Sequence, residues 1–314
     1  MNIYIIGRGA IGKALAVFLK LNGKNAVLVR GSVNDSQNSS ENIQVTMNDG
    51  SIIEATVEVT TLNNIKELKG VVVLTSKSFG NSELAQTLKS KISDSPMVIL
   101  QNGLGVEEPF IDNNFPAVYR CVLFVTSQNI EGGVRFKPVS VCPVGMVKGN
   151  DDELKEITTI LTTQHFQFRP ERDINLVVWK KAIINCAFNS ICPLLEIDNG
   201  IFHRDEKALE LARRVVNECL LVASKKGILL KEDEVIENLL LISRSSDGNL
   251  ISTLQDIRNG QRTEIDTLNF EIARLAEKFN ISEQVQQTKI LGELTKLKSE
   301  IAQRGPAKVK QAVH

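Results

Sequence analysis

The sequence predicts an α/β protein in which a doubly wound parallel sheet is followed by an all-helical C-terminal domain. In the first half of the chain, short apolar and β-branched runs alternate with helical stretches. From about residue 173 onward, the pattern changes to long helical periodicity. This change predicts two domains, one over residues 1–170 and one over residues 171–314.

Four runs in the first half are predicted as strands: residues 2–6, 26–29, 71–75 and 97–100. Their continuous apolar character is typical of strands buried on both faces, and such strands form parallel sheets covered by helices. An irregular β-rich stretch over 118–147 is expected to complete the sheet. A helix over 152–163 is expected to follow it and to close the first domain.

Long helical patterns in the second half include residues 209–226, 232–243 and 263–279. The Asp-Gly-Asn sequence at 247–249 interrupts them and predicts a loop. Asn-Gly at 259–260 predicts a helix stop before the last of the three patterns.

The charge balance and the hydropathy pattern exclude several classes of partner. Lys and Arg total 37, and Asp and Glu also total 37, so no global field would attract nucleic acid or an anionic membrane. Glycines interrupt the apolar start of the chain, and no apolar run approaches the ~20 residues that a bilayer requires. We therefore expect a cytoplasmic protein whose partner is a small molecule.

The cysteine and histidine patterns give no sign of a cross-link or a metal site. The chain has five cysteines, an odd number without a Cys-x-x-Cys pair, and its three histidines are isolated. Buried free thiols are predicted, and no metal is expected.

A glycine-rich motif directly follows the first predicted strand and opens a predicted helix: Gly7-Arg8-Gly9-Ala10-Ile11-Gly12. In this context G-x-G-x-x-G is the fingerprint of a Rossmann-type dinucleotide-binding sheet. Gly7 permits the tight turn, Gly9 lets the backbone approach the pyrophosphate, and Gly12 allows the helix to pack on the strand. The helix N-terminus offers its N–H groups to the phosphates. All six residues are predicted to bind the cofactor.

Three polar residues follow predicted strands at the edge where open α/β sheets bind ligands: Arg30, Lys77 and Asn102. Arg30 stands close to where an NAD enzyme places an acidic residue on the ribose hydroxyls. A guanidinium can bind a 2′-phosphate, whereas a carboxylate would repel it, so NADPH is favoured over NADH. For Arg30 and Lys77 alone, a solvent-exposed surface position is the alternative.

One helical pattern in the second half carries polar residues at a spacing of four: Lys181, Asn185 and Asn189. This spacing places them on one helix face within apolar surroundings, where polar groups need partners. Burial lowers the pKa of a lysine, so Lys181 could donate a proton to a developing alkoxide and polarise a carbonyl. A solvated helix face is the alternative interpretation.

In this order, the motifs resemble the ketopantoate reductase family (2-dehydropantoate 2-reductase) over roughly residues 1–279. Besides the glycine motif, Arg30 and Lys77, the resemblance rests on Asn-Gly-Leu-Gly at 102–105, Trp-x-Lys-x-x-x-Asn-x-x-x-Asn at 179–189, Asn-Gly at 199–200, Ser-Thr-Leu-Gln-Asp at 252–256 and Thr-Glu-Ile-Asp at 263–266.

The resemblance implies reduction of ketopantoate to pantoate with NADPH, a step of pantothenate and coenzyme A biosynthesis. It implies that Lys181 is the general acid and that Glu264 is a second catalytic residue that orients the substrate hydroxyl end. Taken alone, Glu264 could be a first-turn carboxylate favoured by the helix dipole. The implied substrate-binding residues are Asn102, Asn185, Asn189 and Ser252. The implied cofactor residues are the glycine motif, Arg30, Lys77 and Asn102.

The sequence departs from the family pattern at several positions. Phe270 stands where glycine is usual, Gln128 stands where many members have histidine, and the usual Pro-x-Asn near 284–286 is replaced by Gln-x-Gln. The added volume of Phe270 could alter the substrate pocket, and loss of the proline would allow a helix to run on from 279 toward 298.

Two alternatives to ketopantoate reduction stay open. One is a related reductase of another small 2-oxo acid, and the other is a non-catalytic NADPH-binding regulator. A homodimer is compatible with each of them. The basic tail over 304–314 is expected to be a mobile, solvated end.

Overall fold

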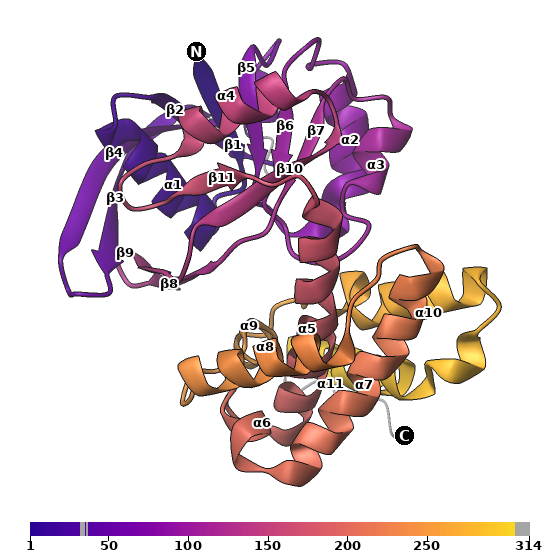
Figure 1. The fold of residues 1–314 in the computed structure, drawn as a ribbon. Coiled ribbons are helices and arrows are strands. Elements are labelled where there is room, and N and C mark those ends of the chain that lie inside the picture. The colour runs from indigo at the N-terminus through magenta and orange to yellow at the C-terminus, as the bar shows by residue number, and fades with distance from the viewer. Residues whose placement is uncertain (32–34, 36, 305–314) are drawn as a thin grey trace, which may run out of the picture. The chain divides into compact units, whose positions relative to one another are not determined.

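The computed structural model describes residues 1–31, 35 and 37–304 (Figure 1). It forms two compact units, which we call the first unit and the second unit. The first unit comprises Met1–Asn102 and Val106–Ile174, and the second comprises Gly103–Gly105 and the chain from Asn175 onward. Ten residues of the predicted basic tail, 305–314, lie outside the described residues.

A single sheet organises the described part of the first unit, with strands in the order β11-β10-β7-β6-β5-β1-β2-β4-β3-β9-β8. The strands are β1 (Asn2–Ile6), β2 (Asn25–Arg30), β3 (Ser39–Met47), β4 (Ile52–Thr61), β5 (Gly70–Leu74), β6 (Met97–Ile99), β7 (Val118–Cys121), β8 (Val125–Ile130), β9 (Gly133–Pro138), β10 (Cys142–Lys148) and β11 (Phe168–Pro170). From β7 through β6, β5, β1 and β2 to β4 the neighbours are parallel. The four predicted strands form its centre, as expected.

Helices cover both faces of this sheet, which confirms the doubly wound fold. Helices α1 (Ala10–Leu21) and α4 (Asp151–Leu161) contribute to the apolar core on one face. Helices α2 (Asn81–Lys89) and α3 (Glu108–Asp112) contribute to the core on the other face. Strand order reverses at β1, with β2 on one side and β5 on the other. Such a reversal point is where open α/β sheets bind ligands.

The hairpin of β3 and β4 was not predicted from the sequence. These two strands pair antiparallel around a turn in which Met47 N donates to Ser51 O. Exposed and buried residues alternate in the middle of β3, so a search for continuous apolar runs does not find it. Asp49-Gly50 was the available hairpin signal. The complete sheet is therefore mixed: the pairs β3–β4, β8–β9 and β7–β10 are antiparallel, and the remaining neighbours are parallel.

The second unit is helical throughout its described part, which confirms the predicted helical region. Its α-helices are α5 (Ile174–Leu195), α6 (Ile201–Arg204), α7 (Glu206–Lys225), α8 (Glu232–Ser245), α9 (Ser252–Arg258), α10 (Asn269–Lys278) and α11 (Gln286–Arg304). The loop at 247–249 and the helix stop at 259–260 lie where they were predicted.

Two helix predictions in this unit were wrong. Residues 263–268 do not continue α10; they form a 3-10 turn (Ile265–Thr267), and Leu268 has a non-helical backbone. The helix also does not run on from 279 toward 298. Asn280 adopts a φ of 57°, and Ile281 N donates to Ala276 O, which ends α10. Asparagine tolerates this left-handed conformation, so the helix ends here without a proline.

Phe270, the large residue at a usual glycine position, packs against a glycine of α11. A Cβ atom at Gly292 would lie 3.7 Å from the Phe270 ring and 2.8 Å from Asn269 Cβ. Lys296 Nζ lies 4.9 Å from the centroid of the same ring. The volume that Phe270 adds is thus accommodated between α10 and α11.

All five cysteines are buried and free, as predicted. Within residues 1–31, 35 and 37–304, no helix is both long enough and apolar enough to cross a membrane.

Candidate functional site

The glycine motif joins β1 to α1 in a tightly packed turn. Gly7 adopts a φ of 126°, and a Cβ atom there would lie 2.4 Å from Ser76 N. A Cβ atom at Gly12 would lie 2.1 Å from Gly7 O, whereas one at Gly9 would have no neighbour within 4 Å. Gly7 and Gly12 therefore permit the packing of the turn. Gly9 leaves open space at the start of α1.

The start of α1 suits an anionic group. Gly9 is its N-cap and provides no side-chain hydrogen bond, and the first turn contains no acidic residue. The first N–H groups of a helix lack intrahelical partners, and the helix dipole makes this end positive. A phosphate could accept hydrogen bonds here.

Arg30, the predicted 2′-phosphate residue, already binds a carboxylate. Its Nη1 and Nη2 atoms donate to the two oxygens of Asp35, each at 2.8 Å, and Nη2 also donates to Gln37 O. The backbone N–H of Gln37 and the Arg30 guanidinium hold the pKa of Asp35 below its usual value. The sequence has no acidic residue at the end of β2 itself, but Asp35, five residues after Arg30, pairs with it.

Arg8 is paired in a similar way. It is exposed, and its guanidinium contacts Glu41 on β3 at 2.6 and 3.1 Å. Because β3 was not predicted, this ion pair could not be predicted either.

A buried amide pair fixes the segments that carry Lys77 and Asn102. Gln101 Oε1 accepts a hydrogen bond from Asn81 Nδ2 at 2.7 Å, and Gln101 Nε2 donates to Ser76 O at 2.9 Å. Lys77 follows Ser76, and Asn102 follows Gln101, at the ends of the adjacent strands β5 and β6. Both predicted residues are half-buried. The structure thus places them at neighbouring points of the carboxyl edge.

Helix α5 carries Lys181, Asn185 and Asn189 at the predicted spacing. Lys181 and Asn185 are half-buried, and Asn189 is only 4% exposed. Asn189 Oδ1 accepts a hydrogen bond from Thr253 Oγ1 at 2.7 Å. Thr253 follows the exposed Ser252, the first residue of α9. Two predicted substrate residues, Asn189 and Ser252, are therefore linked through Thr253, which sequence reasoning had not assigned a role.

Glu264 is half-buried and directly precedes the 3-10 turn Ile265–Thr267. Its carbonyl oxygen accepts hydrogen bonds from Thr267 N and Thr267 Oγ1, both at 3.1 Å. Leu104 N donates to Thr267 O at 2.8 Å, and a Cβ atom at Gly103 would lie 2.2 Å from Thr267 Oγ1. Gly103 of the Asn-Gly-Leu-Gly sequence therefore has to be a glycine, because it packs against the turn that follows Glu264.

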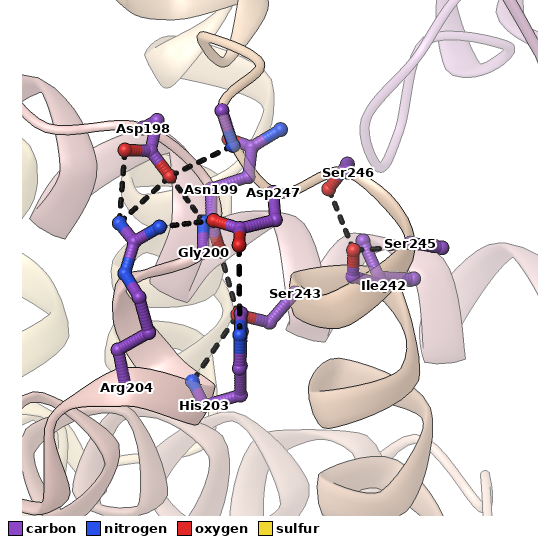
Figure 2. A network of polar contacts seen from close by, with 11 residues as sticks. Asp198, Asn199, Gly200, His203, Arg204, Ile242, Ser243, Ser245, Ser246 and Asp247 are labelled. Carbon is purple, nitrogen blue, oxygen red and sulfur yellow. Dashed lines mark hydrogen bonds and ion pairs between the residues drawn. The ribbon is translucent and has the colours of Figure 1, made fainter.

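A polar network outside the predicted site holds the segment that leads to Ser252 (Figure 2). Asp198 accepts hydrogen bonds from Gly200 N at 2.7 Å, from Gly248 N at 3.2 Å and from Arg204 Nη2 at 2.9 Å. Arg204 also contacts Asp247. The Arg204 hydrogen bond is the main cause that lowers the pKa of Asp198 to about 2. The loop before α9 is thus tied to the start of α6.

The same network contains a serine, a histidine and an aspartate, but not in a nucleophilic arrangement. Ser243 is fully buried, and its hydroxyl donates to Asn199 O at 2.7 Å. His203 Nδ1 lies 3.1 Å from Ser243 Oγ, and His203 Nε2 lies 3.8 Å from Asp247 Oδ2. A buried hydroxyl that donates to a carbonyl oxygen cannot attack a substrate, so the network is structural.

The described side chains offer a lysine, carboxamides and hydroxyls, which suit proton donation and hydrogen bonding. Among residues 1–31, 35 and 37–304, no group of three or more His, Cys, Asp or Glu side chains could hold a metal ion.

Comparison with known proteins gives matches along most of the chain. Residues 3–138 match the family described as "Ketopantoate reductase PanE/ApbA", and residues 173–298 match "Ketopantoate reductase PanE/ApbA C terminal". The 2-dehydropantoate 2-reductase of Pyrococcus abyssi is 25% identical over 283 residues, covering 90% of this chain and 93% of that protein.

Two solved structures have a similar fold. D-mandelate dehydrogenase with NADH and anilino(oxo)acetate superposes with a TM-score of 0.81 at 23% identity, covering 96% of this chain and 98% of that chain. A ketopantoate reductase from Staphylococcus aureus, described as dimeric, gives a TM-score of 0.79 at 18% identity, covering 95% of this chain and 100% of that chain.

Proposed function

The chain belongs to the ketopantoate reductase family of oxidoreductases, and on that premise we propose that it reduces 2-dehydropantoate (ketopantoate) to pantoate with NADPH, a step of pantothenate and coenzyme A biosynthesis. Residues 1–170 act as the dinucleotide-binding domain and residues 171–314 as the substrate and catalytic domain. One observation carries the proposal: α5 presents Lys181 and Asn185 on the face where Asn189 is bonded to Thr253, next to Ser252.

The glycine motif, Arg30, Lys77 and Asn102 would hold the cofactor. The open space at Gly9 and the uncapped start of α1 fit a pyrophosphate. When bound, the reduced nicotinamide supplies the hydride that adds to C2 of the 2-oxo acid. Arg30 favours NADPH because its guanidinium can bind a 2′-phosphate, provided that the phosphate displaces Asp35.

Lys181 acts as the general acid in this proposal. As C2 gains a hydride, its carbonyl oxygen becomes an alkoxide, and Lys181 Nζ delivers the proton that completes the hydroxyl group. Before that step, the ammonium charge polarises the carbonyl.

The other predicted residues bind and orient the substrate. Asn185 and Ser252 donate hydrogen bonds to the 2-oxo acid, and Asn102 contacts both the substrate and the cofactor. Asn189 belongs to this set and also holds the start of α9 through Thr253. Glu264 accepts a hydrogen bond from the substrate hydroxyl end.

The test compares two adjacent lysines of α5 in the purified chain. NADPH oxidation is followed by its absorbance with ketopantoate as the substrate. Lys181→Ala should lower kcat by about 10²- to 10⁴-fold. Lys180→Ala is the matched control, because Lys180 lies in the same helix and pairs only weakly with Glu234, at 3.9 Å. Wild-type turnover by Lys181→Ala would refute the general-acid assignment.

A related reductase of another 2-oxo acid is the second candidate. It is favoured by the fold similarity to a D-mandelate dehydrogenase. A panel of aliphatic and aromatic 2-oxo acids, run with NADPH and with NADH, separates it from ketopantoate reduction. NADPH binding without turnover of any 2-oxo acid would instead indicate the non-catalytic regulator.

A further inference from the structure

Strand β7 contains an arginine, Arg120, that is only 2% exposed. Arginine is seldom buried this far unless it is paired. Its guanidinium makes an ion pair with the Glu107 carboxylate, and its Nη2 atom donates to Gln101 O at 3.4 Å. A buried ion pair costs solvation energy and often gives no more stability than apolar side chains of similar size. The reason for this pair therefore lies in what its contacts hold in place.

The two contacts of Arg120 hold the two ends of one loop. Gln101 directly precedes Asn102, the predicted contact to substrate and cofactor, and Glu107 directly precedes α3. Between these ends, two glycines adopt positive φ values of 98° and 68°. A segment with two glycines has many accessible backbone conformations. Fixing both of its ends restricts the positions that Asn102 can reach.

A buried asparagine joins the same two ends of the loop. Asn81 is the first residue of α2, and its Nδ2 atom donates to Gln101 Oε1 at 2.7 Å and to Val106 O at 2.8 Å. Gln101 Nε2 donates in return to Asn81 Oδ1 at 2.9 Å. Asn81 thus connects residue 101 to residue 106, and Arg120 connects residue 101 to residue 107. We call these four residues the polar clamp: Asn81, Gln101, Glu107 and Arg120.

We propose that the polar clamp, through Arg120, positions Asn102 for its contacts with the cofactor and the 2-oxo acid. This inference rests on the role given to Asn102 in the proposed function. Arg120 is a positioning residue, because it is buried in the sheet and acts through the backbone of Gln101. The alternative is that the ion pair only attaches α3 to the sheet. The two explanations differ in how Arg120 and Asn102 depend on each other.

The first test measures the mobility of the loop and does not depend on turnover. In the full chain, Arg120→Met/Glu107→Met, the clamp variant, replaces the ion pair by apolar side chains, a change that often preserves stability. Hydrogen exchange followed by mass spectrometry should become at least about tenfold faster over residues 101–107 and stay unchanged over α1. The matched control is Tyr119→Phe, which removes a hydroxyl contact to Glu153 from the neighbouring position of β7. It should leave exchange in the loop as in the wild type.

The second test links the polar clamp to Asn102 by a double-mutant cycle. Dissociation constants for NADPH and NADH are measured by calorimetric titration in the wild type, Asn102→Ala, the clamp variant and the combination of all three substitutions. Each change alone should weaken cofactor binding about three- to tenfold, whereas adding Asn102→Ala to the clamp variant should weaken it by less than about twofold. An ion pair that only attaches α3 to the sheet predicts instead that the two effects multiply.

Three results would overturn the proposal. They are wild-type exchange over residues 101–107 in the folded clamp variant, effects that multiply in the cycle, and wild-type cofactor binding by Asn102→Ala. If the clamp variant does not fold, Arg120→Lys takes its place in both tests, because lysine keeps the charge but lacks the planar fork that reaches two acceptors. Failure of the proposed reaction is seen separately, as a wild type that turns over no 2-oxo acid while exchange and cofactor binding change as expected.

Discussion

The two units differ in how they build their candidate sites. In the first unit, the glycine motif is one continuous segment whose function depends on backbone geometry, since Gly7 and Gly12 allow close approaches and Gly9 leaves space. In the second unit, the candidate residues come from α5, α9 and the turn at Ile265–Thr267, and side-chain hydrogen bonds such as Asn189 to Thr253 hold them together. A contiguous site is specified locally, whereas a dispersed site depends on the packing of the whole unit.

The largest expected effect tests the local character of the first site. Gly12→Ala should destabilise the first unit by about 3 kcal/mol, because its Cβ atom would overlap Gly7 O. Gly9→Ala should keep Tm near the wild-type value but weaken NADPH binding at least about tenfold, because its Cβ atom would enter the space proposed for the pyrophosphate. Thermal unfolding and calorimetric titration measure the two effects. Equal loss of stability in both variants would contradict the view that Gly12 is needed for packing and Gly9 for cofactor binding.

This difference also explains what the sequence could predict. The motif from Gly7 to Gly12 was found because strand, glycines and helix are adjacent in the chain, and the spacing of Lys181, Asn185 and Asn189 was found because a helix has a fixed period. The contact of Arg30 with Asp35 and the bond of Asn189 to Thr253 were not found. Each of these contacts joins two segments that are brought together only by the tertiary fold, and no local sequence pattern predicts such a contact.

The dispersed site should be sensitive to the single hydrogen bond between α5 and α9. Thr253→Val keeps the side-chain shape but leaves the buried Asn189 Oδ1 without its donor, which costs about 1–3 kcal/mol. We expect kcat/KM for the 2-oxo acid to fall roughly tenfold, because Ser252 begins the same helix. Thr253→Ser, which keeps the hydroxyl group, should restore most of the activity. Steady-state kinetics and urea unfolding distinguish misplacement of α9 from loss of folding.

The pairing of Arg30 with Asp35 should set the preference between NADPH and NADH. Arg30→Ala should weaken NADPH binding roughly tenfold and change NADH binding little, because a charge-assisted contact to a phosphate is worth about 1.5–3 kcal/mol. Asp35→Asn should strengthen NADPH binding, because the Arg30 guanidinium then no longer has to break an ion pair with a carboxylate before it binds the 2′-phosphate. Dissociation constants for both cofactors give the result. If the dissociation constants for NADPH and NADH changed by the same factor, the 2′-phosphate would not be bound by Arg30.

The smallest expected effect concerns the network that holds the loop before α9. In the folded protein the pKa of Asp198 is lowered from the ordinary 3.8 to about 2, mainly by Arg204. The ionised carboxylate therefore stabilises the fold fully above the ordinary pKa, and this stabilisation is lost as the pH falls toward the pKa of the folded state. Asp198→Asn should therefore destabilise the second unit by about 1 kcal/mol at neutral pH, after allowance for solvent screening. The difference from the wild type should close between about pH 4 and pH 2.

Trp179, the single tryptophan of the chain, lies buried in α5 and provides a fluorescence signal for unfolding of the second unit. Arg204→Met removes the main cause of the lowered pKa and should flatten the acid part of the wild-type stability curve in the same way. If Asp198→Asn instead differs from the wild type by a constant amount down to about pH 2, the carboxylate acts only as a hydrogen-bond acceptor that asparagine cannot replace. In that case the loop before Ser252 is held by geometry and not by charge.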